Sequence, residues 1–120
     1  MAQSVNIVDL LQAGMKAEGA RQKTIASNIA NIETPGYRRV DIKFEELLTK
    51  ALNSSGTATI DDIEPEVYQP RDTSVRSNGN DVNMEAEVGN LVKNSLRYTA
   101  YVRLMQKKFA QIEAAISLRM

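Results

Sequence analysis

The chain has 120 residues, of which 42% are hydrophobic and 5% aromatic, and this length fits one domain or one domain with a flexible insert. Lys and Arg total 15, as do Asp and Glu, so a formal net charge of +0 gives no long-range attraction to nucleic acid or to an anionic membrane. The absence of Cys and His excludes thiol and imidazole chemistry and the usual zinc sites, and we expect no cofactor.

The N-terminal segment, residues 1–34, has neither a basic stretch nor a long apolar run, so we expect no cleavable signal peptide and no transmembrane segment. Its apolar residues alternate three and four apart, which predicts a helix over Val5–Ile32 with the seam of a heptad repeat. The predicted seam consists of Val8, Leu11, Met15, Ile25, Ile29 and Ile32. Gly14 and Gly19 each lower helix propensity by about 1 kcal/mol relative to Ala, so this helix needs a partner.

A sharp stop follows the helix. Pro35 disfavours helix for Thr34 before it, and Pro35-Gly36 suits the two central positions of a type II turn, with Gly36 supplying the positive φ. Asn28 and Asn31 share a helix face just before the stop, which predicts side-chain hydrogen bonds to a neighbouring backbone or helix. The simpler alternative is a helix end with solvated asparagines.

The middle of the chain, residues 35–82, is predicted to hold a turn, a short helix and a flexible or β-containing stretch. The short helix is expected over Glu45–Leu52. Pro65 and Pro70 exclude an uninterrupted helix after it and leave a short extended segment or a hairpin. Disorder of residues 53–80 is the other alternative, because few apolar residues there could offset the cost of ordering.

The C-terminal segment, residues 83–120, is predicted to be one long helix. Asn83 suits the N-cap, and Glu85 and Glu87 lie in the first turn, where the helix dipole favours negative charge. The three-and-four spacing again runs along one stripe, which Ser95 interrupts. This predicted seam consists of Val88, Leu91, Tyr98, Val102, Met105, Phe109, Ile112 and Ile116.

These elements predict a mainly α fold. The two long terminal helices should pair as an antiparallel, coiled-coil-like hairpin that buries both seams, with a partly extended or disordered middle. Each apolar stripe is wider than one seam. We therefore expect the remaining apolar surface to contact other subunits.

Two separated motifs resemble the axial proteins of the bacterial flagellum, which form its rod and hook. The first has the pattern Ser-Asn-hydrophobic-Ala-Asn followed by Thr-Pro-Gly-Tyr, and it comprises Ser27, Asn28, Ala30, Asn31, Thr34, Pro35, Gly36 and Tyr37. The second resembles the C-terminal half of the proximal rod family of FlgB type, and it comprises Asn78, Gly79, Asn80, Val82, Met84, Glu85, Asn94, Ser95, Leu96 and Tyr98. The short middle excludes the larger hook and distal-rod members.

The resemblance implies a structural subunit whose terminal helices pack in the inner layer of a helical tube, the drive shaft between the membrane ring and the hook. It implies as partners other copies, other rod proteins, the membrane-ring protein, the rod adaptor and the type III export apparatus. It implies a place in the periplasmic rod of the basal body. The turn at Thr34–Tyr37 would set the angle at which the chain leaves the inner layer.

The residues allow two other functions. An enzyme would have to use the acidic cluster of Asp61, Asp62 and Glu64, which is more typical of a solvated loop, and no Gly-rich phosphate loop is present. A helical export chaperone or adaptor could bind a partner through its apolar stripe. The stripe alone does not distinguish this alternative from a rod subunit, whereas the two motifs favour the rod.

Overall fold

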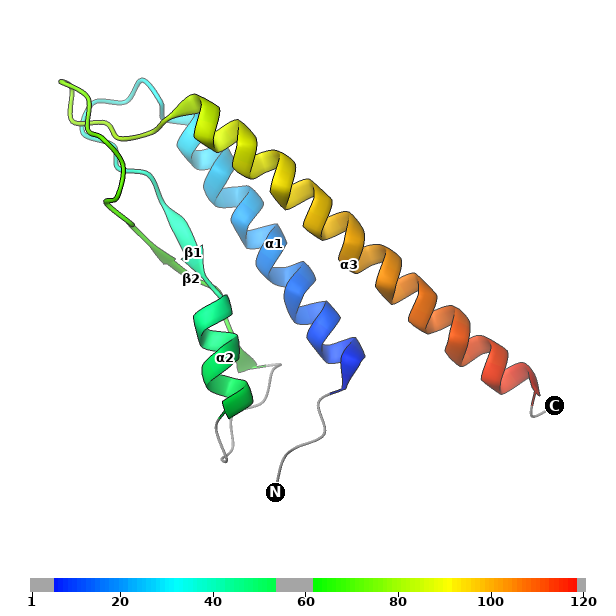
Figure 1. Ribbon diagram of the computed structural model, residues 1–120. Coiled ribbons are helices and arrows are strands. Elements are labelled where there is room, and N and C mark those ends of the chain that lie inside the picture. Colours follow the sequence, from blue (N-terminus) through cyan, green and yellow to red (C-terminus); the bar gives the residue numbers. More distant parts are fainter. Residues whose placement is uncertain (1–5, 54–61, 119–120) are drawn as a thin grey trace.

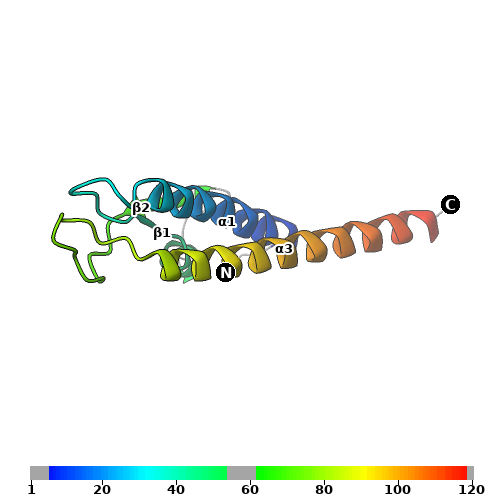
Figure 2. The same cartoon turned by 90° about the horizontal axis from the view of Figure 1, so that it is seen from above.

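A computed structural model describes residues 6–53 and 62–118. Two long helices run antiparallel and pack against each other, which confirms the predicted fold class (Figure 1). The elements are α1 (Ile7–Ala30), β1 (Asp41–Lys43), α2 (Glu45–Asn53), β2 (Glu66–Tyr68) and α3 (Met84–Leu118). The molecule is long and thin, with extents of 67 × 31 × 15 Å, and α3 extends well beyond the start of α1 (Figure 2).

Helix α1 lies between its two neighbours, with the strand pair and α2 on one side and α3 on the other (Figure 1). Asn6 caps its start, since the side chain accepts a hydrogen bond of 2.9 Å from the backbone of Val8. It ends at Ala30, two residues before the predicted end, and Asn31 is the C-cap. Val5, the predicted first residue, lies outside the described residues.

The middle of the chain contains both elements that the sequence favoured. Helix α2 matches the expected short helix. Strands β1 and β2 pair antiparallel, with Ile42 opposite Val67, so the extended alternative holds for Glu66–Tyr68. Pro65 and Pro70 flank β2 outside its pairing, where their missing N–H groups cost no ladder hydrogen bond. Residues 54–61 lie outside the described residues.

The apolar core is small and lies between α1 and the β1–α2 segment. Its buried members are Ala13, Ala17, Ile42 and Phe44, and Ala20, Leu48 and Ile63 pack against it. None of these α1 residues belongs to the predicted seam. The apolar core of one chain therefore does not follow the predicted α1 seam.

Within the described ranges, no helix has both the length and the apolar character needed to cross a membrane.

Candidate functional site

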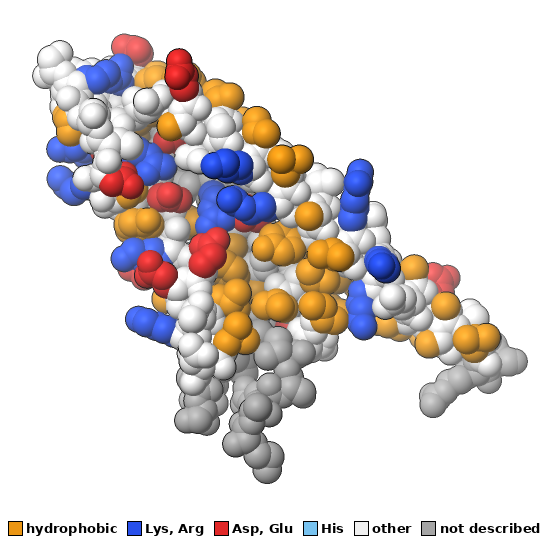
Figure 3. All heavy atoms as spheres, viewed as in Figure 1, with side chains coloured by type: hydrophobic (Ala, Val, Ile, Leu, Met, Phe, Trp, Pro, Cys, Tyr) orange, Lys and Arg blue, Asp and Glu red, His pale blue; other side chains and the backbone are white. Residues whose placement is uncertain are grey.

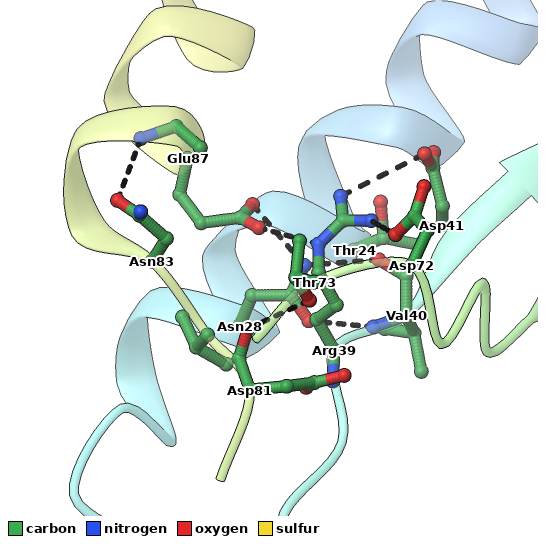
Figure 4. Close-up of polar contacts among 12 residues, drawn as sticks. Thr24, Asn28, Arg39, Val40, Asp41, Asp72, Thr73, Asp81, Asn83 and Glu87 are labelled. Atoms are coloured by element: carbon green, nitrogen blue, oxygen red, sulfur yellow. Dashed lines mark hydrogen bonds and ion pairs between the residues drawn. The ribbon is translucent and has the colours of Figure 1, made fainter. Parts of the chain in front are cut away.

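The two sequence motifs, far apart in the chain, meet where the end of α1 faces the start of α3. Five buried polar residues form this contact, which we call the polar joint: Asn28, Arg39, Asn80, Asp81 and Glu87. They come from α1, from the segment after the Pro-Gly turn, from the loop before α3 and from the first turns of α3 (Figure 4). The joint therefore ties together four separate parts of the chain.

Asn28 lies at the centre of the polar joint and is 0% exposed. Its Nδ2 donates to the Val40 carbonyl at 2.9 Å and to Glu87 Oε2 at 3.1 Å, and its Oδ1 accepts from the Val40 amide at 2.9 Å. The Tyr37 hydroxyl also donates to Oδ1, at 3.0 Å, and lies 3.0 Å from Ser27 Oγ. The side chain thus bonds both backbone groups of Val40, so the solvated-asparagine alternative is wrong for this residue.

The Thr34–Tyr37 turn has the predicted form. The Tyr37 amide donates to the Thr34 carbonyl at 3.3 Å, and Gly36 has a φ of 76°, as a type II turn requires. Gly36 also donates from its amide to the Asn78 carbonyl at 2.9 Å. A Cβ on Gly79, whose φ is 86°, would lie 3.3 Å from Gly36 Cα, so the two glycine turns are in close contact.

Asn80 holds the end of α1 from the loop before α3. Its Nδ2 donates to the backbone carbonyls of Asn31 and Thr34, both at 2.9 Å, and its Oδ1 accepts from the Val82 amide at 2.8 Å. Asn31 in turn donates from Nδ2 to the Ser27 carbonyl at 2.8 Å, one turn back. The carbonyls that a helix end leaves unpaired are therefore partly satisfied by side chains.

A buried ion pair connects the strand segment to α3. Arg39 Nε donates to Glu87 Oε1 at 2.9 Å, and the Arg39 guanidinium also lies 3.7 Å from Asp41 and 3.9 Å from Asp72 (Figure 4). Burial alone would lower the pKa of Arg39, but the hydrogen bond to Glu87 and the three negative charges raise it overall. Arg39 therefore stays charged throughout the physiological range.

Asp81 fixes the loop before α3. Its Oδ1 accepts from the Arg39 amide at 2.6 Å, and its backbone carbonyl accepts from Thr73 Oγ1 at 3.0 Å. Its Oδ2 is buried and accepts no hydrogen bond among the described residues, but it lies 3.5 Å from Arg38 Nη1. The carboxylate is thus compensated by charge as well as by hydrogen bonding.

A second polar contact joins the helices farther along. Asn94 of α3 donates from Nδ2 to the Glu18 carbonyl at 2.7 Å and to Glu18 Oε2 at 2.8 Å. Arg21 donates to Glu18 Oε1 at 2.6 Å and to both carboxylate oxygens of Glu45, at 2.8 and 3.0 Å. Glu18 is therefore buried between α1 and α3, and Arg21 connects it to Glu45 of α2.

The described residues contain no group of three acidic, His or Cys side chains that could hold a metal ion. The carboxylates of the polar joint are instead paired with Arg39, Arg38 and backbone amides. The chemistry of this site is that of a rigid connection, because each of the five side chains has at least one directional partner on a different segment.

Comparison with known proteins identifies relatives of this chain. A family model described as flagella basal body rod protein matches residues 10–38, which cover most of α1 and the Pro-Gly turn. Flagellar basal body rod protein FlgB of Bacillus subtilis (strain 168) is 28% identical over 89% of this chain and 90% of its own. FlgB of Yersinia enterocolitica is 32% identical over 72% of this chain and 76% of its own. The chain belongs to the FlgB family of flagellar basal body rod proteins.

The rod protein is thus a structural component of the flagellar basal body, from a family that is structural rather than enzymatic. Of the acidic cluster weighed for catalysis, Asp61 lies outside the described residues and Glu64 forms an ion pair with Lys16.

The remaining motif residues of this rod protein lie around the joint. Ala30 is the last residue of α1, and Thr34, Pro35 and Gly36 are exposed. The structure therefore brings the whole first motif together with Asn80 and Glu87, which stood in or beside the second motif but were not among the predicted site residues. Asn78 precedes Gly79 in a turn, and Asn80 and Asp81 follow it, and this could have signalled side chains bonding to a backbone nearby.

The predicted seams are only partly buried within one chain of the rod protein. On α1, Leu11 and Ile25 are buried, whereas Val8, Met15, Ile29 and Ile32 are half-buried. On α3, Leu91, Val102 and Met105 are half-buried, whereas Val88, Tyr98, Phe109, Ile112 and Ile116 are exposed.

The expectation that α1 would cover the α3 seam was therefore wrong for these five exposed residues. For Val88 and Tyr98 the reason is register, because α1 contacts the heptad position one residue earlier, at Glu87, Asn94 and Tyr101. Phe109, Ile112 and Ile116 are exposed because α3 there extends beyond the start of α1 (Figure 2).

Tyr101 needs Gly14 opposite it. A Cβ at position 14 would lie 2.7 Å from the Tyr101 ring, closer than packed atoms approach. Gly14 thus allows the ring to lie against the α1 backbone, which is a packing reason for a residue that otherwise weakens the helix. Gly19, by contrast, has no atom within 4 Å of an added Cβ.

Proposed function

We propose that the chain polymerises through its terminal helices as a structural subunit of the proximal rod, and that it transmits torque from the membrane ring toward the hook. The observation that carries the proposal is the apolar surface of α3. Among residues 6–53 and 62–118, ten of the fourteen exposed large hydrophobic residues belong to this one helix. They are Met84, Val88, Val92, Leu96, Tyr98, Leu104, Phe109, Ile112, Ile116 and Leu118.

This surface is larger than one chain needs. Apolar side chains run along the length of α3 in the space-filling view, interspersed with polar positions (Figure 3). Soluble monomers rarely leave such extended apolar areas open, and larger ones usually mark contacts between proteins. Neighbouring subunits would bury these side chains, with a gain of about 25 cal/mol per Å² of apolar area.

The polar joint suits a part that carries load. Buried hydrogen bonds and ion pairs are directional, so they fix the angle and register of two helices more tightly than apolar contacts do. Asn28 and Glu87 connect α1 to α3, and Arg39 connects both to the strand segment. In this proposal the joint keeps the subunit rigid while torque passes through it.

The same proposal includes the partners of the subunit and the route by which it is exported. The partners are other copies, other rod proteins, the membrane-ring protein and the rod adaptor at the base of the flagellum. The subunit reaches the periplasmic rod through the type III export apparatus. Membership of the basal-body rod family supports these assignments.

A charge on the exposed seam tests the polymerisation. Phe109 is 55% exposed, so Phe109→Asp should leave the fold of the monomer unchanged, as judged by circular dichroism. It should abolish rod assembly and motility in a strain that has no other copy of the gene, because a carboxylate would be buried between subunits. Ala110→Asp, on a neighbouring exposed position outside the stripe, is the control. Normal assembly with Phe109→Asp would contradict the proposal.

An apolar stripe alone would also allow an export chaperone or adaptor, whereas membership of the rod protein family favours a rod subunit. The same strains distinguish the two. A chaperone would be absent from purified basal bodies, whereas a rod subunit would be present in them.

A further inference from the structure

The last part of α3 has no neighbour within the described chain. Every residue from 109 to 118 is exposed, and we call this segment the overhang. Its length is about 15 Å at 1.5 Å per residue. Phe109, Ile112 and Ile116 form an apolar stripe along it, and Glu113 is its one charged residue. A helical segment of this kind is a typical ligand for a groove that offers apolar contact and a positive charge.

Such a groove lies on the outer face of α1. It has a volume of about 640 Å³, and both small or apolar residues and longer polar side chains line it. Its lining residues are Lys16, Gly19, Ala20, Gln22, Lys23, Ala26, Glu64 and Pro65. The α1 part, from residue 16 to residue 26, spans about 15 Å, which equals the length of the overhang.

Among the described residues, no neighbour requires the missing Cβ of Gly19. Glycine inside a helix lowers its stability, yet an added Cβ here would meet no atom within 4 Å. This contrasts with Gly14 in the same helix, whose missing Cβ makes room for Tyr101. A glycine on an open groove floor allows the close approach of a helix from another molecule.

The charges of the two surfaces are complementary. Lys16 on one rim is paired with Glu64, whereas the Lys23 side chain has no hydrogen bond or ion pair among residues 6–53 and 62–118. The Glu113 carboxylate is likewise unpaired within those ranges. The groove thus offers one unmatched cation, and the overhang offers one unmatched anion.

We propose that the overhang of one subunit docks in the α1 groove of a second copy, with Phe109, Ile112 and Ile116 over Gly19 and Ala26, and with Glu113 paired to Lys23. The inference rests on the proposed function and names the contact through which polymerisation proceeds. The contact is head-to-tail, since the two surfaces differ and occur once each per chain. Such contacts generate open helical assemblies when the rotation does not close, as a rod requires.

Disulfide cross-linking tests the contact directly, because the chain has no Cys of its own. Gln22→Cys together with Ile116→Cys places one thiol on each surface, and both positions are exposed. Gln22→Cys with Ala114→Cys, which is off the apolar stripe, is the matched control. Each pair is introduced into the sole copy of the gene, and purified basal bodies are oxidised and separated by mass.

The proposal expects a cross-linked band at twice the chain mass for the first pair and at least about tenfold less for the control. Equal or absent cross-linking in basal bodies that contain the chain overturns the docking contact but leaves the proposed function standing. A band that joins this chain to a different rod protein would contradict the proposal that a second copy occupies the α1 groove. Absence of the unmodified chain from basal bodies overturns the proposed function itself.

Charge reversal supplies a second, independent test. Lys23→Glu and Glu113→Lys should each reduce the number of assembled rods by about fivefold, and the double variant should restore most of the loss, because the pair is re-formed with its signs exchanged. Gly19→Leu should block assembly while leaving the helicity of the free chain unchanged. The contact is contradicted if the double variant assembles no more rods than the worse single variant, or if Gly19→Leu assembles normally.

Discussion

The two ends of α3 use opposite kinds of side chain. Near its start, α3 packs on α1 through Glu87 and Asn94, which are buried and polar. Near its end it presents Phe109, Ile112 and Ile116, which are apolar and exposed. This is the reverse of the usual distribution in a globular protein, where apolar groups are inside. The comparison indicates that contacts within the subunit and contacts between subunits rest on different forces.

The difference has a physical reason. A buried polar pair costs a large desolvation free energy unless its geometry is right, so it permits one register between two helices and penalises others. Apolar contact is non-directional and scales with area, which suits a surface that must meet several neighbours. The joint thus defines the shape of the subunit, and the exposed stripe supplies affinity for assembly.

Removing Glu87 should have the largest effect on the joint. Glu87→Ala leaves Arg39 and Asn28 without their buried partner, and we expect the free energy of unfolding to fall by about 3 kcal/mol. Urea denaturation of the free chain measures this loss. Glu85→Ala, in the same helical turn but exposed, should change the stability by less than about 0.5 kcal/mol. Similar losses for both variants would show that the joint does not hold the helices together.

The two glycines of α1 should respond in opposite directions. Gly14→Ala places a methyl group against the Tyr101 ring and should destabilise the free chain by about 1–3 kcal/mol. Gly19→Ala meets open space and should stabilise it by up to about 1 kcal/mol, because Ala favours helix. Thermal unfolding of the two variants beside the parent protein compares them. The same sign for both would mean that Tyr101 does not pack on Gly14 in solution.

The smallest expected effect is a loss of stability at low pH through Glu45. Burial alone would raise the pKa of Glu45, but the hydrogen bond from Arg21 and the charges of Arg21 and Arg97 lower it overall from 4.5. Since the folded pKa is the lower one, the carboxylate stabilises the fold above about pH 4.5, and this contribution is lost as the pH falls through the folded value. The side chain is 68% exposed, so solvent limits the contribution to less than about 1 kcal/mol.

Glu45→Gln should therefore lower stability slightly at pH 7 and make a smaller difference at pH 3. Unfolding curves at the two pH values measure this, and Glu46→Gln, which lacks an ion pair among the described residues, is the control. A loss at pH 3 as large as the loss at pH 7 would exclude an electrostatic origin.

Much of the fold was predictable because its signals are local. Pro35 and Gly36 fix the end of α1 and the form of the turn, and Asn83 caps α3, with its Oδ1 3.2 Å from the Ala86 amide. Three-and-four spacing predicts where helices occur, since it reflects the geometry of one helix.

The helix contact was not predictable in the same way. Periodicity assumes that the apolar stripe is the buried one, and here α1 covers Glu87 and Asn94 instead. Their partners, Arg39 and Glu18, come from distant parts of the chain, and no spacing rule connects them. Gly14 likewise resembled a weak point until Tyr101 was found against it. The prediction that the α3 seam is covered by other subunits stays a prediction.

Hydrogen exchange of the free chain and of purified basal bodies tests the central claim most directly. If internal packing and assembly use different surfaces, backbone amides at the start of α3 should be protected in both samples, whereas those of residues 109–118 should exchange rapidly in the free chain and become protected in the rod. Equal protection of residues 109–118 in the free chain and in the rod would contradict the account.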